Sequence, residues 1–224
     1  MPRTLVFDVN ETLLDLRALE APFEAVFGDP GVRADWFRTL LHQAMVTTIT
    51  GPYVDFSTLG RQSLEVVAEQ RGRTLAEDEA TTILQAMRTL PPHDDVREAL
   101  AVLRDAGFQL VALSNGTPDV LRAQLDHAAL ADAFAHIFSV DAAGRLKPAP
   151  EPYRMVAHEL GAETSDLRMV AAHAWDTTGA QRAGWAAAFV ARSGTRLAPS
   201  DPVPDIVGED LRDVARQIVA LETG

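Results

Sequence analysis

The sequence predicts an α/β fold, a doubly wound, Rossmann-like parallel sheet core with an inserted helical cap domain. Short apolar runs of strand length alternate with stretches of helical period, which is the pattern of a parallel sheet covered by helices. A long stretch between the first and second apolar runs has helical period and no convincing strand. The predicted strands are Thr4 to Val9, Gln109 to Ser114, Arg168 to Ala172 and Ala187 to Val190, with a short last strand near Ile206.

Helices are expected between and after these strands, most of them opened or closed by Pro, Gly, Asp or Asn. They cover residues 96–106, 118–125, 152–160, 178–184 and 211–221. Such helices would lie on both faces of the sheet. The Pro-containing segment 193–204 is expected to be a loop.

The long helical stretch predicts a second domain. Residues 16–92 are assigned to the cap, and residues 1–15 and 93–224 to the core. The double proline Pro91-Pro92 ends the last cap helix and marks one hinge, while the opposite hinge falls near Asp15.

Length, charge and cysteine content narrow the class of protein. The chain has 224 residues, which suits one large domain or a core with a sizeable insertion. Its formal charge of −12 argues against binding to nucleic acid or to anionic lipid surfaces. The first apolar stretch is too short for a signal peptide or a membrane span, and zero Cys gives no sign of an oxidising compartment. We therefore expect a cytoplasmic protein with no nucleic-acid or membrane partner.

Two rare residue types direct attention to particular positions. The 20 basic residues comprise 19 Arg and a single Lys, Lys147, although Lys is a compact point charge and Arg a wide planar fork. A lone Lys therefore suggests a place where only the point charge fits, or else chance survival in an Arg-biased composition. The only asparagines, Asn10 and Asn115, each follow an apolar run by a residue or two.

Polar side chains follow the ends of the predicted strands, where ligands gather in an open α/β sheet. They are Asp8, Asn10 and Thr12 at or just after the end of the first strand, Ser114 and Asn115 at the end of the second, and His173 and Asp176 after the third, with Lys147 in a loop. If the fold is right, these groups converge on one edge. A protein of charge −12 can still bind an anion there, where Lys147, backbone N–H groups and helix N-termini make a local positive pocket.

The order of these motifs resembles the haloacid dehalogenase superfamily over essentially the full length of the chain. Asp8 would stand in its first motif, Ser114 in the second, Lys147 in the third and Asp176 in the fourth. The strings Ser114-Asn115-Gly116 and Ala174-Trp175-Asp176 are similar to the 2-haloacid dehalogenase branch, of the type II, L-2-haloacid dehalogenase kind.

The residues also separate the branches of this superfamily on chemical grounds. A phosphatase needs a second Asp two residues after the nucleophile, to protonate the leaving alkoxide and to help hold Mg²⁺. Here that position is Asn10, and Ala171 and Ala172 stand where phosphatases usually carry another acidic ligand. A halide departs without a proton, so a dehalogenase needs neither the second Asp nor the further acidic metal ligand. The sequence thus favours dehalogenation with no metal and no other cofactor.

The resemblance implies a mechanism for a small 2-haloacid substrate. Asp8 would attack the halogen-bearing carbon and form an ester, which water would hydrolyse to the 2-hydroxy acid. Lys147 would pair with Asp8 and keep it ionised, and Asp176 would orient Lys147 or activate the water.

The remaining groups would hold the substrate. Ser114 and the backbone N–H groups after Asp8, including that of Val9, would bind the substrate carboxylate, while Thr12 would support Asp8. The resemblance also favours a homodimer.

The halide cradle of the family includes an amide, an aromatic ring and a cap arginine. Asn115 and Phe56 match the first two by their spacing. The arginine usually follows a cap Trp directly, whereas this chain reads Trp36-Phe37-Arg38, so Arg38 is a candidate one position away. Further expected substrate contacts are Asn10, where many members carry Tyr, His173, where many carry Asn, and Trp175.

Structural roles for the same residues stay open. Asp8 could form an Asx turn and Asp176 could cap a helix. Trp175 and Phe56 could belong to the core, and Tyr153 could either pack under the site or touch substrate.

Two rival functions also stay open. One is a Mg²⁺-dependent phosphatase or phosphonatase of the same fold, against which Asn10 counts. The other is a catalytically silent member that binds a small acid or a partner protein through the capped cleft.

Overall fold

The computed structural model describes residues 4–223, and these form one six-stranded sheet with the strand order β3-β2-β1-β4-β5-β6. All neighbouring strands are parallel. The strands are β1 (Thr4–Phe7), β2 (Gln109–Ser114), β3 (His136–Ser139), β4 (Leu167–Ala171), β5 (Ala186–Val190) and β6 (Ile206–Gly208). The predicted fold class is confirmed. Residues 1–3 and 224, which the sequence analysis assigns to the core domain, lie outside the described residues.

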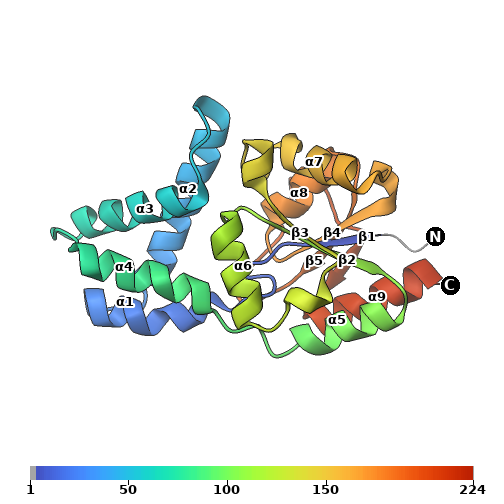
Figure 1. Ribbon diagram of the computed structural model, residues 1–224, viewed down its shortest axis with the longest axis horizontal. Helices are drawn as coiled ribbons and strands as arrows, with labels where there is room; N and C mark the ends of the chain where they lie inside the picture. Colours follow the sequence, from blue (N-terminus) through green and yellow to red (C-terminus); the bar gives the residue numbers. More distant parts are fainter. Residues whose placement is uncertain (1–3, 224) are drawn as a thin grey trace.

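Helices cover both faces of this sheet, as Figure 1 shows. On one face α5 and α9 lie side by side, and on the other α7 packs against α8. The helices of this part of the chain are α5 (Val96–Asp105), α6 (Pro118–His127), α7 (Pro150–Leu160), α8 (Ala174–Arg182) and α9 (Leu211–Thr223). The strand order reverses between β1 and β4, and ligands of doubly wound sheets bind at this reversal, beyond the carboxyl ends of the strands.

A helical insert, residues 16–92, lies between β1 and β2 and stands to one side of the sheet in Figure 1. Its helices are α1 (Glu20–Phe27), α2 (Val32–Thr50), α3 (Phe56–Gln70) and α4 (Glu77–Ala86). The chain enters and leaves the insert at one place, because Asp15 N donates to Pro91 O at 2.9 Å and His93 N donates to Leu13 O at 3.0 Å. Both connections therefore cross beside the carboxyl end of β1.

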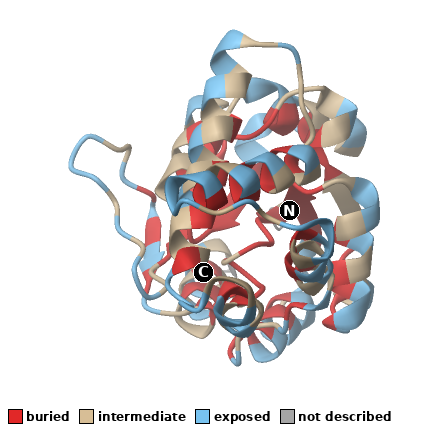
Figure 2. Ribbon diagram, turned by 90° about the vertical axis from the view of Figure 1, so that its left-hand side faces the viewer, coloured by how far each residue is buried: buried red, intermediate tan, exposed pale blue. Residues whose placement is uncertain are grey.

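The strands and the inner sides of the helices make the apolar core, which Figure 2 shows as the buried interior. Val6, Val111 and Val170 on three neighbouring strands are completely buried. Both faces of these strands are covered, which explains why they are continuous apolar runs and not alternating patterns. No helix in residues 4–223 is both long enough and apolar enough to span a membrane.

Several element bounds differ by one or two residues from the sequence-based prediction, and three differences matter most. The strand β3 was missed, because four residues beginning with the exposed His136 make too short and too polar a run. β1 ends at Phe7, two residues earlier than predicted, so Asp8 and Val9 lie beyond the strand. The prediction that a helix begins at residue 178 was wrong: α8 begins at Ala174 and contains Asp176 in its first turn, with His173 as its N-cap.

Candidate active site

Lys147 is completely buried and lies between two carboxylates. Its Nζ donates to Asp8 Oδ1 at 2.9 Å, to Asp176 Oδ2 at 2.6 Å and to the Leu113 carbonyl oxygen at 2.9 Å. These acceptors use all the N–H donors of an ammonium group. The chain thus brings together residues from the ends of β1 and β2, from a loop and from α8 around its single lysine.

Asp8 is held in its ionised form by its neighbours. The Thr12 hydroxyl donates to Asp8 Oδ2 at 2.6 Å and itself accepts the Ala172 N–H at 2.9 Å. Burial alone would raise the pKa of Asp8, but the charges of Lys147 and His173 and the Thr12 hydrogen bond outweigh it and leave the pKa below its usual value. A buried carboxylate that stays charged is a suitable nucleophile.

Asp176 has the opposite electrostatic character. Tyr153 Oη donates to Asp176 Oδ1 at 2.7 Å. Burial and the nearby charge of Asp8 raise the pKa of Asp176, although Lys147 opposes this. The pKa of Lys147 is itself raised, because the two carboxylates outweigh the effect of burial. The environment therefore lowers the pKa of one carboxyl group, Asp8, and raises that of the other, Asp176, so that Asp176 binds a proton more readily.

A small cavity of about 10 Å³, room for about one water molecule, lies over Asp8. The core part of the chain and the insert both contribute to its wall. Its lining residues are Asp8, Asn10, Phe37, Leu41, Phe56, Ser114, Asn115, His173 and Trp175.

The amide of Asn115 fixes the loop that carries the lysine. Asn115 Oδ1 accepts the backbone N–H of Lys147 at 2.8 Å, and Asn115 Nδ2 lies 3.5 Å from the Lys147 carbonyl oxygen. At the end of β2, Ser114 Oγ accepts the N–H of Gly116 at 3.0 Å, which leaves the hydroxyl proton available to a ligand. Asn115 thus positions Lys147 as well as lining the cavity.

Aromatic rings form the opposite wall. The ring of His173 stacks on Trp175, with centroids 5.0 Å apart and an interplanar angle of 19°, and lies 6.1 Å from the ring of Phe37. His173 Nε2 is 3.4 Å from Glu11 Oε2. This imidazole is therefore held at the cavity by packing on two sides and by a carboxylate on a third.

The predicted site residues take different places around this cavity. Thr12, Lys147 and Asp176 lie behind Asp8 and not in the wall, and Val9 is completely buried outside it. Arg38 does not line the cavity: its side chain is 75% exposed and pairs with Asp35 at 2.9 Å.

Sequence reasoning missed several residues of the site. Phe37, and not Arg38, faces the cavity, together with Leu41 one turn further along α2. This four-residue spacing on a helix was visible in the sequence and could have indicated both. The contact of Glu11 with His173 had no sequence signal.

The donor set is a poor fit for a metal ion. In residues 4–223 there is no group of three or more His, Cys, Asp or Glu side chains placed to hold one. Asn10 stands where a second carboxylate would be needed, and its Oδ1 accepts a hydrogen bond from Gln124 Nε2 at 3.0 Å. A divalent cation prefers several carboxylate oxygens, so no metal-dependent step is derived for this site.

Comparison with known proteins gives one consistent result. Residues 2–184 match the family model of the haloacid dehalogenase-like hydrolases. The chain is 31% identical over 194 residues to an (S)-2-haloacid dehalogenase of Xanthobacter autotrophicus, covering 86% of this chain and 76% of that protein. It is 29% identical over 212 residues to an (S)-2-haloacid dehalogenase of Pseudomonas sp. (strain YL), covering 94% and 91%.

Solved structures agree with the sequence matches. The fold is similar to the L-2-haloacid dehalogenase from Xanthobacter autotrophicus with chloropropionic acid covalently bound, with a TM-score of 0.91, 28% identity and coverage of 97% of this chain and 98% of that one. Together with the family match, this establishes the family. The chain belongs to the haloacid dehalogenase-like hydrolases, in the branch of the 2-haloacid dehalogenases.

Proposed function

We propose that this enzyme is a hydrolytic dehalogenase that removes halide from short 2-haloalkanoic acids, with Asp8 as nucleophile. The observation that carries the proposal is the position of Lys147, which donates to both Asp8 and Asp176 in a buried site. The dehalogenase relatives and the covalent chloropropionate complex of a similar structure support it.

In the first step, a carboxylate oxygen of Asp8 attacks carbon 2 of the substrate. The carbon–halogen bond breaks, the halide leaves with the bonding electrons, and an ester joins Asp8 to the acid. Because the cavity is small and its wall largely apolar, the carboxylate reacts with little of its hydration shell. Thr12 and Lys147 fix both of its oxygens in place.

In the second step, water adds to the ester carbonyl and loses one proton to Asp176, the group with the raised pKa. The bond between the Asp8 carbonyl carbon and the substrate oxygen then breaks, and that oxygen takes a proton from Lys147, which regains one from Asp176. The 2-hydroxy acid leaves, and Asp8 loses the remaining water proton to solvent and is restored as a carboxylate. Tyr153 and Lys147 hold Asp176 in place for this role.

Binding of the substrate carboxylate is assigned to the hydroxyl of Ser114 and to backbone N–H groups after Asp8. Ser114 lines the cavity and has a free hydroxyl proton. Asn10 lies on the same wall.

The helical insert is proposed to act as a cap. It supplies Phe37, Leu41 and Phe56 to the cavity wall, while the core supplies Asp8. The insert also reaches the core at a distance from the cavity, where Arg145 Nη1 donates to the Thr48 carbonyl oxygen at 2.8 Å. A cavity of about 10 Å³ admits a haloacid only when these parts separate. The homodimer and the cytoplasmic location stay predictions.

The test is halide release from (S)-2-chloropropionate and fluoroacetate in EDTA. We expect the parent enzyme to release halide and Asp8→Asn to release none, whereas Asp105→Asn, on the exposed side of α5, should behave as the parent. Metal-dependent release of phosphate from an aryl phosphate, without halide release, would favour the phosphatase instead. Binding of a haloacid with no turnover would favour a silent binding protein.

A further inference from the structure

One residue in the cavity wall can carry a positive charge. The residues that the insert contributes, Phe37, Leu41 and Phe56, present only carbon. Lys147 lies behind Asp8 with all its donors in use. Among the lining residues, this leaves His173 as the side chain whose charge changes between about pH 5 and 8.

His173 is held in one orientation. It is 8% exposed, lies between the rings of Trp175 and Phe37, and has Nε2 3.4 Å from Glu11 Oε2. A ring with one nitrogen directed at a carboxylate has its other nitrogen free for a ligand.

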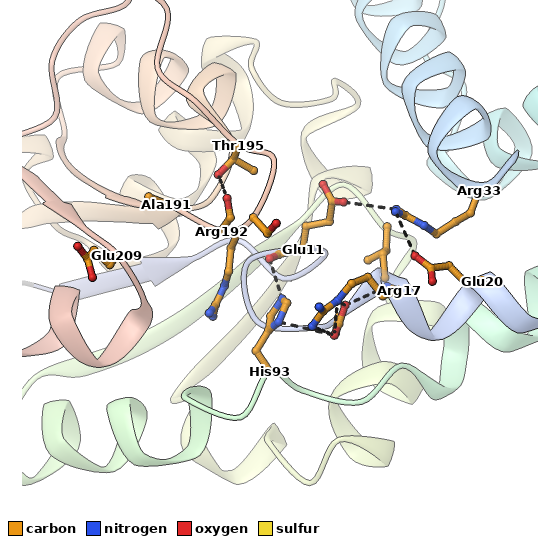
Figure 3. Close-up of a pocket in the computed structure, with 12 residues that line it drawn as sticks. Glu11, Arg17, Glu20, Arg33, His93, Ala191, Arg192, Thr195 and Glu209 are labelled. Atoms are coloured by element: carbon orange, nitrogen blue, oxygen red, sulfur yellow. Dashed lines mark hydrogen bonds and ion pairs between the residues drawn. The ribbon is translucent and has the colours of Figure 1, made fainter. Parts of the chain in front are cut away.

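Glu11 is placed for this contact by the backbone and by the insert. Its φ of 63° lies in the left-handed region, which is uncommon for a residue other than glycine and is found at functional sites. On α2, Arg33 Nη1 lies 3.8 Å from Glu11 Oε1 and Arg33 Nη2 lies 3.8 Å from Glu20 Oε1. Figure 3 shows the Arg33 side chain between these two carboxylates. The Glu11 carboxylate therefore links the helix α2 of the insert to His173 of the core.

A second N–H donor belongs to Trp175, which also lines the cavity. The indole Nε1–H of Trp175 is buried and has no hydrogen-bond partner among the described residues. Buried donors are nearly always paired, so this unpaired N–H on a residue that lines the cavity is taken as a candidate donor to a ligand.

We propose that His173, in its protonated form and positioned by Glu11, receives the departing halide together with the Trp175 N–H. The proposal rests on the proposed function, because it assigns a role in the displacement by Asp8. As the bond from carbon 2 to the halogen breaks, the electron pair goes to the halide, and the imidazolium N–H donates a hydrogen bond to it. No proton is transferred in this step.

Assistance of this kind depends on the leaving group. Chloride is a poorer leaving group than bromide and a stronger hydrogen-bond acceptor, so its departure gains more from a cationic donor. Removing one donor aimed at developing negative charge costs about 10²–10³-fold in rate. Loss of His173 should therefore slow release of chloride far more than release of bromide.

The rate should also depend on pH through this ring. Charged groups face it from several elements: Asp8 and Glu11 after β1, Arg33 and Arg38 on α2, and Arg196 in the loop after β5. Chloride release should fall as pH rises and the ring loses its proton.

The kinetic test compares kcat/KM for (S)-2-chloropropionate and (S)-2-bromopropionate over pH. We expect His173→Asn to lower the chloride rate about 100-fold and the bromide rate less than about tenfold, and to abolish the alkaline fall. Glu11→Gln should also lower the chloride rate more than the bromide rate, because the ring then lacks the carboxylate that positions it. The exposed changes His127→Asn and Glu24→Gln serve as matched controls.

A binding test gives a readout that does not need turnover. Sodium bromide is titrated into the parent and into His173→Asn at about pH 6, where an imidazole is largely protonated, and the ring signals of histidine are followed by NMR. We expect saturable shifts of one histidine in the parent that are absent from the variant.

The outcomes separate this inference from the proposed function. If His173→Asn loses the same factor on both substrates and keeps the pH profile of the parent, the role of His173 is wrong while Asp8 remains the nucleophile. The same holds if His173→Asn is fully active. If the parent turns over but bromide does not shift His173, the inference is also wrong. If the parent releases no halide yet binds bromide at His173, the proposed function is wrong and the anion-binding site at His173 is retained. If the parent neither releases halide nor binds bromide, both the proposed function and the site are wrong.

Discussion

Lys147 shows why one residue of its kind survives in a chain that otherwise uses arginine. Its small ammonium group donates to three acceptors at 2.6, 2.9 and 2.9 Å, and its side chain is completely buried. A guanidinium spreads more donors over a rigid plane, and this site has neither the acceptors nor the space for them.

Lys147→Arg should therefore lower kcat/KM by at least about 100-fold, since the point charge at Asp8 is misplaced. Steady-state halide release measures this, with circular dichroism to check that the fold is kept. Arg122→Lys, an exposed site on α6, is the matched control and should be near parent activity. Full activity of Lys147→Arg would contradict the role given to the lone lysine.

The pKa of Asp8 predicts how activity responds to acid. Because this pKa is lowered, the proposed nucleophile stays ionised above its folded pKa, and activity should be lost only as pH falls through that pKa. Thr12→Val removes the hydroxyl that donates to Asp8 Oδ2, so the pKa of Asp8 should rise and the acid limb of kcat/KM should move to higher pH.

Thr12→Ser keeps the hydroxyl and should restore the parent profile. If the acid limb were the same in Thr12→Val and in the parent, the Thr12 hydroxyl would not control Asp8.

The sequence allowed the central residues of the site to be predicted, because Asp8, Lys147 and Asp176 each follow an apolar run or lie in a motif of recognisable order. It also allowed Thr12 and most of the residues that line the cavity to be predicted, but not Phe37, Leu41 or the contact of Glu11. The contact between Glu11 and His173 depends on a left-handed backbone angle and on side-chain rotamers of two separate loops, neither of which leaves a pattern in the sequence.

At the scale of elements, the early start of α8 places Asp176 and Gly179 on a helix that packs closely against its neighbours. A Cβ at Gly179 would lie 2.5 Å from Tyr153 Oη and 2.9 Å from the Pro148 carbonyl oxygen. Both contacts belong to the segment that carries Lys147 and supports Asp176. This position thus links helix packing to the geometry of the site.

Gly179→Ala should destabilise the protein by about 1–3 kcal/mol through overpacking and lower kcat, because Tyr153 must move away from Asp176. Thermal unfolding and halide release measure the two effects. Gly60→Ala is the matched change: its Cβ would meet neighbours at an ordinary 3.8 Å, so stability should be equal or higher. Equal behaviour of the two variants would contradict the close packing at α8.

Asp95 joins the start of α5 to two other parts of the chain, the loop after β5 and the start of α9. It lies just before α5, accepts from Arg192 Nη1 at 2.6 Å and from the Leu211 N–H at the start of α9 at 2.6 Å, and is 4% exposed. Burial would raise the pKa of Asp95, but these two donors outweigh it and lower the pKa.

Asp95→Ala should cost about 3–5 kcal/mol at neutral pH, because Arg192 loses its buried partner. Since the folded pKa of Asp95 is lowered, this contribution is present at neutral pH and lost as pH falls through the folded value. Urea unfolding of the parent and the variant should therefore show a difference that shrinks in acid. A difference independent of pH, or no larger than that of the exposed change Asp132→Ala, would contradict this account.

Five of the six described strands and most helices were predictable because their apolar runs and capping residues are local signals. The start of α8 was not, because the predicted boundary followed the polar run Asp176-Thr177-Thr178, whereas burial of Thr177 and Ala180 holds this turn as a helix. Tertiary packing here overrides local preference.

At the scale of the whole molecule, the proposed reaction depends on two parts of the chain meeting over Asp8. The core supplies the charged groups, and the helical insert supplies the apolar side of the wall, with Phe37, Leu41 and Phe56. The sequence predicted the insert from the absence of strands between Asp15 and Pro92. Of the insert's side chains in the wall, Phe56 was predicted, whereas Arg38 was chosen in place of Phe37, and a shift of one residue turns a helix position by about 100°.

The central claim is that Asp8 forms a bond to the substrate, and the source of the product oxygen tests it most directly. A single turnover of (S)-2-chloropropionate by excess enzyme is run in water labelled with heavy oxygen, and the 2-hydroxy acid and the peptide containing Asp8 are weighed by mass spectrometry. The account predicts an unlabelled hydroxyl in the product and one heavy oxygen in Asp8, because the carboxylate gives its own oxygen and regains one from water. A labelled product with unlabelled Asp8 would mean that water attacks the substrate directly, and would contradict the account.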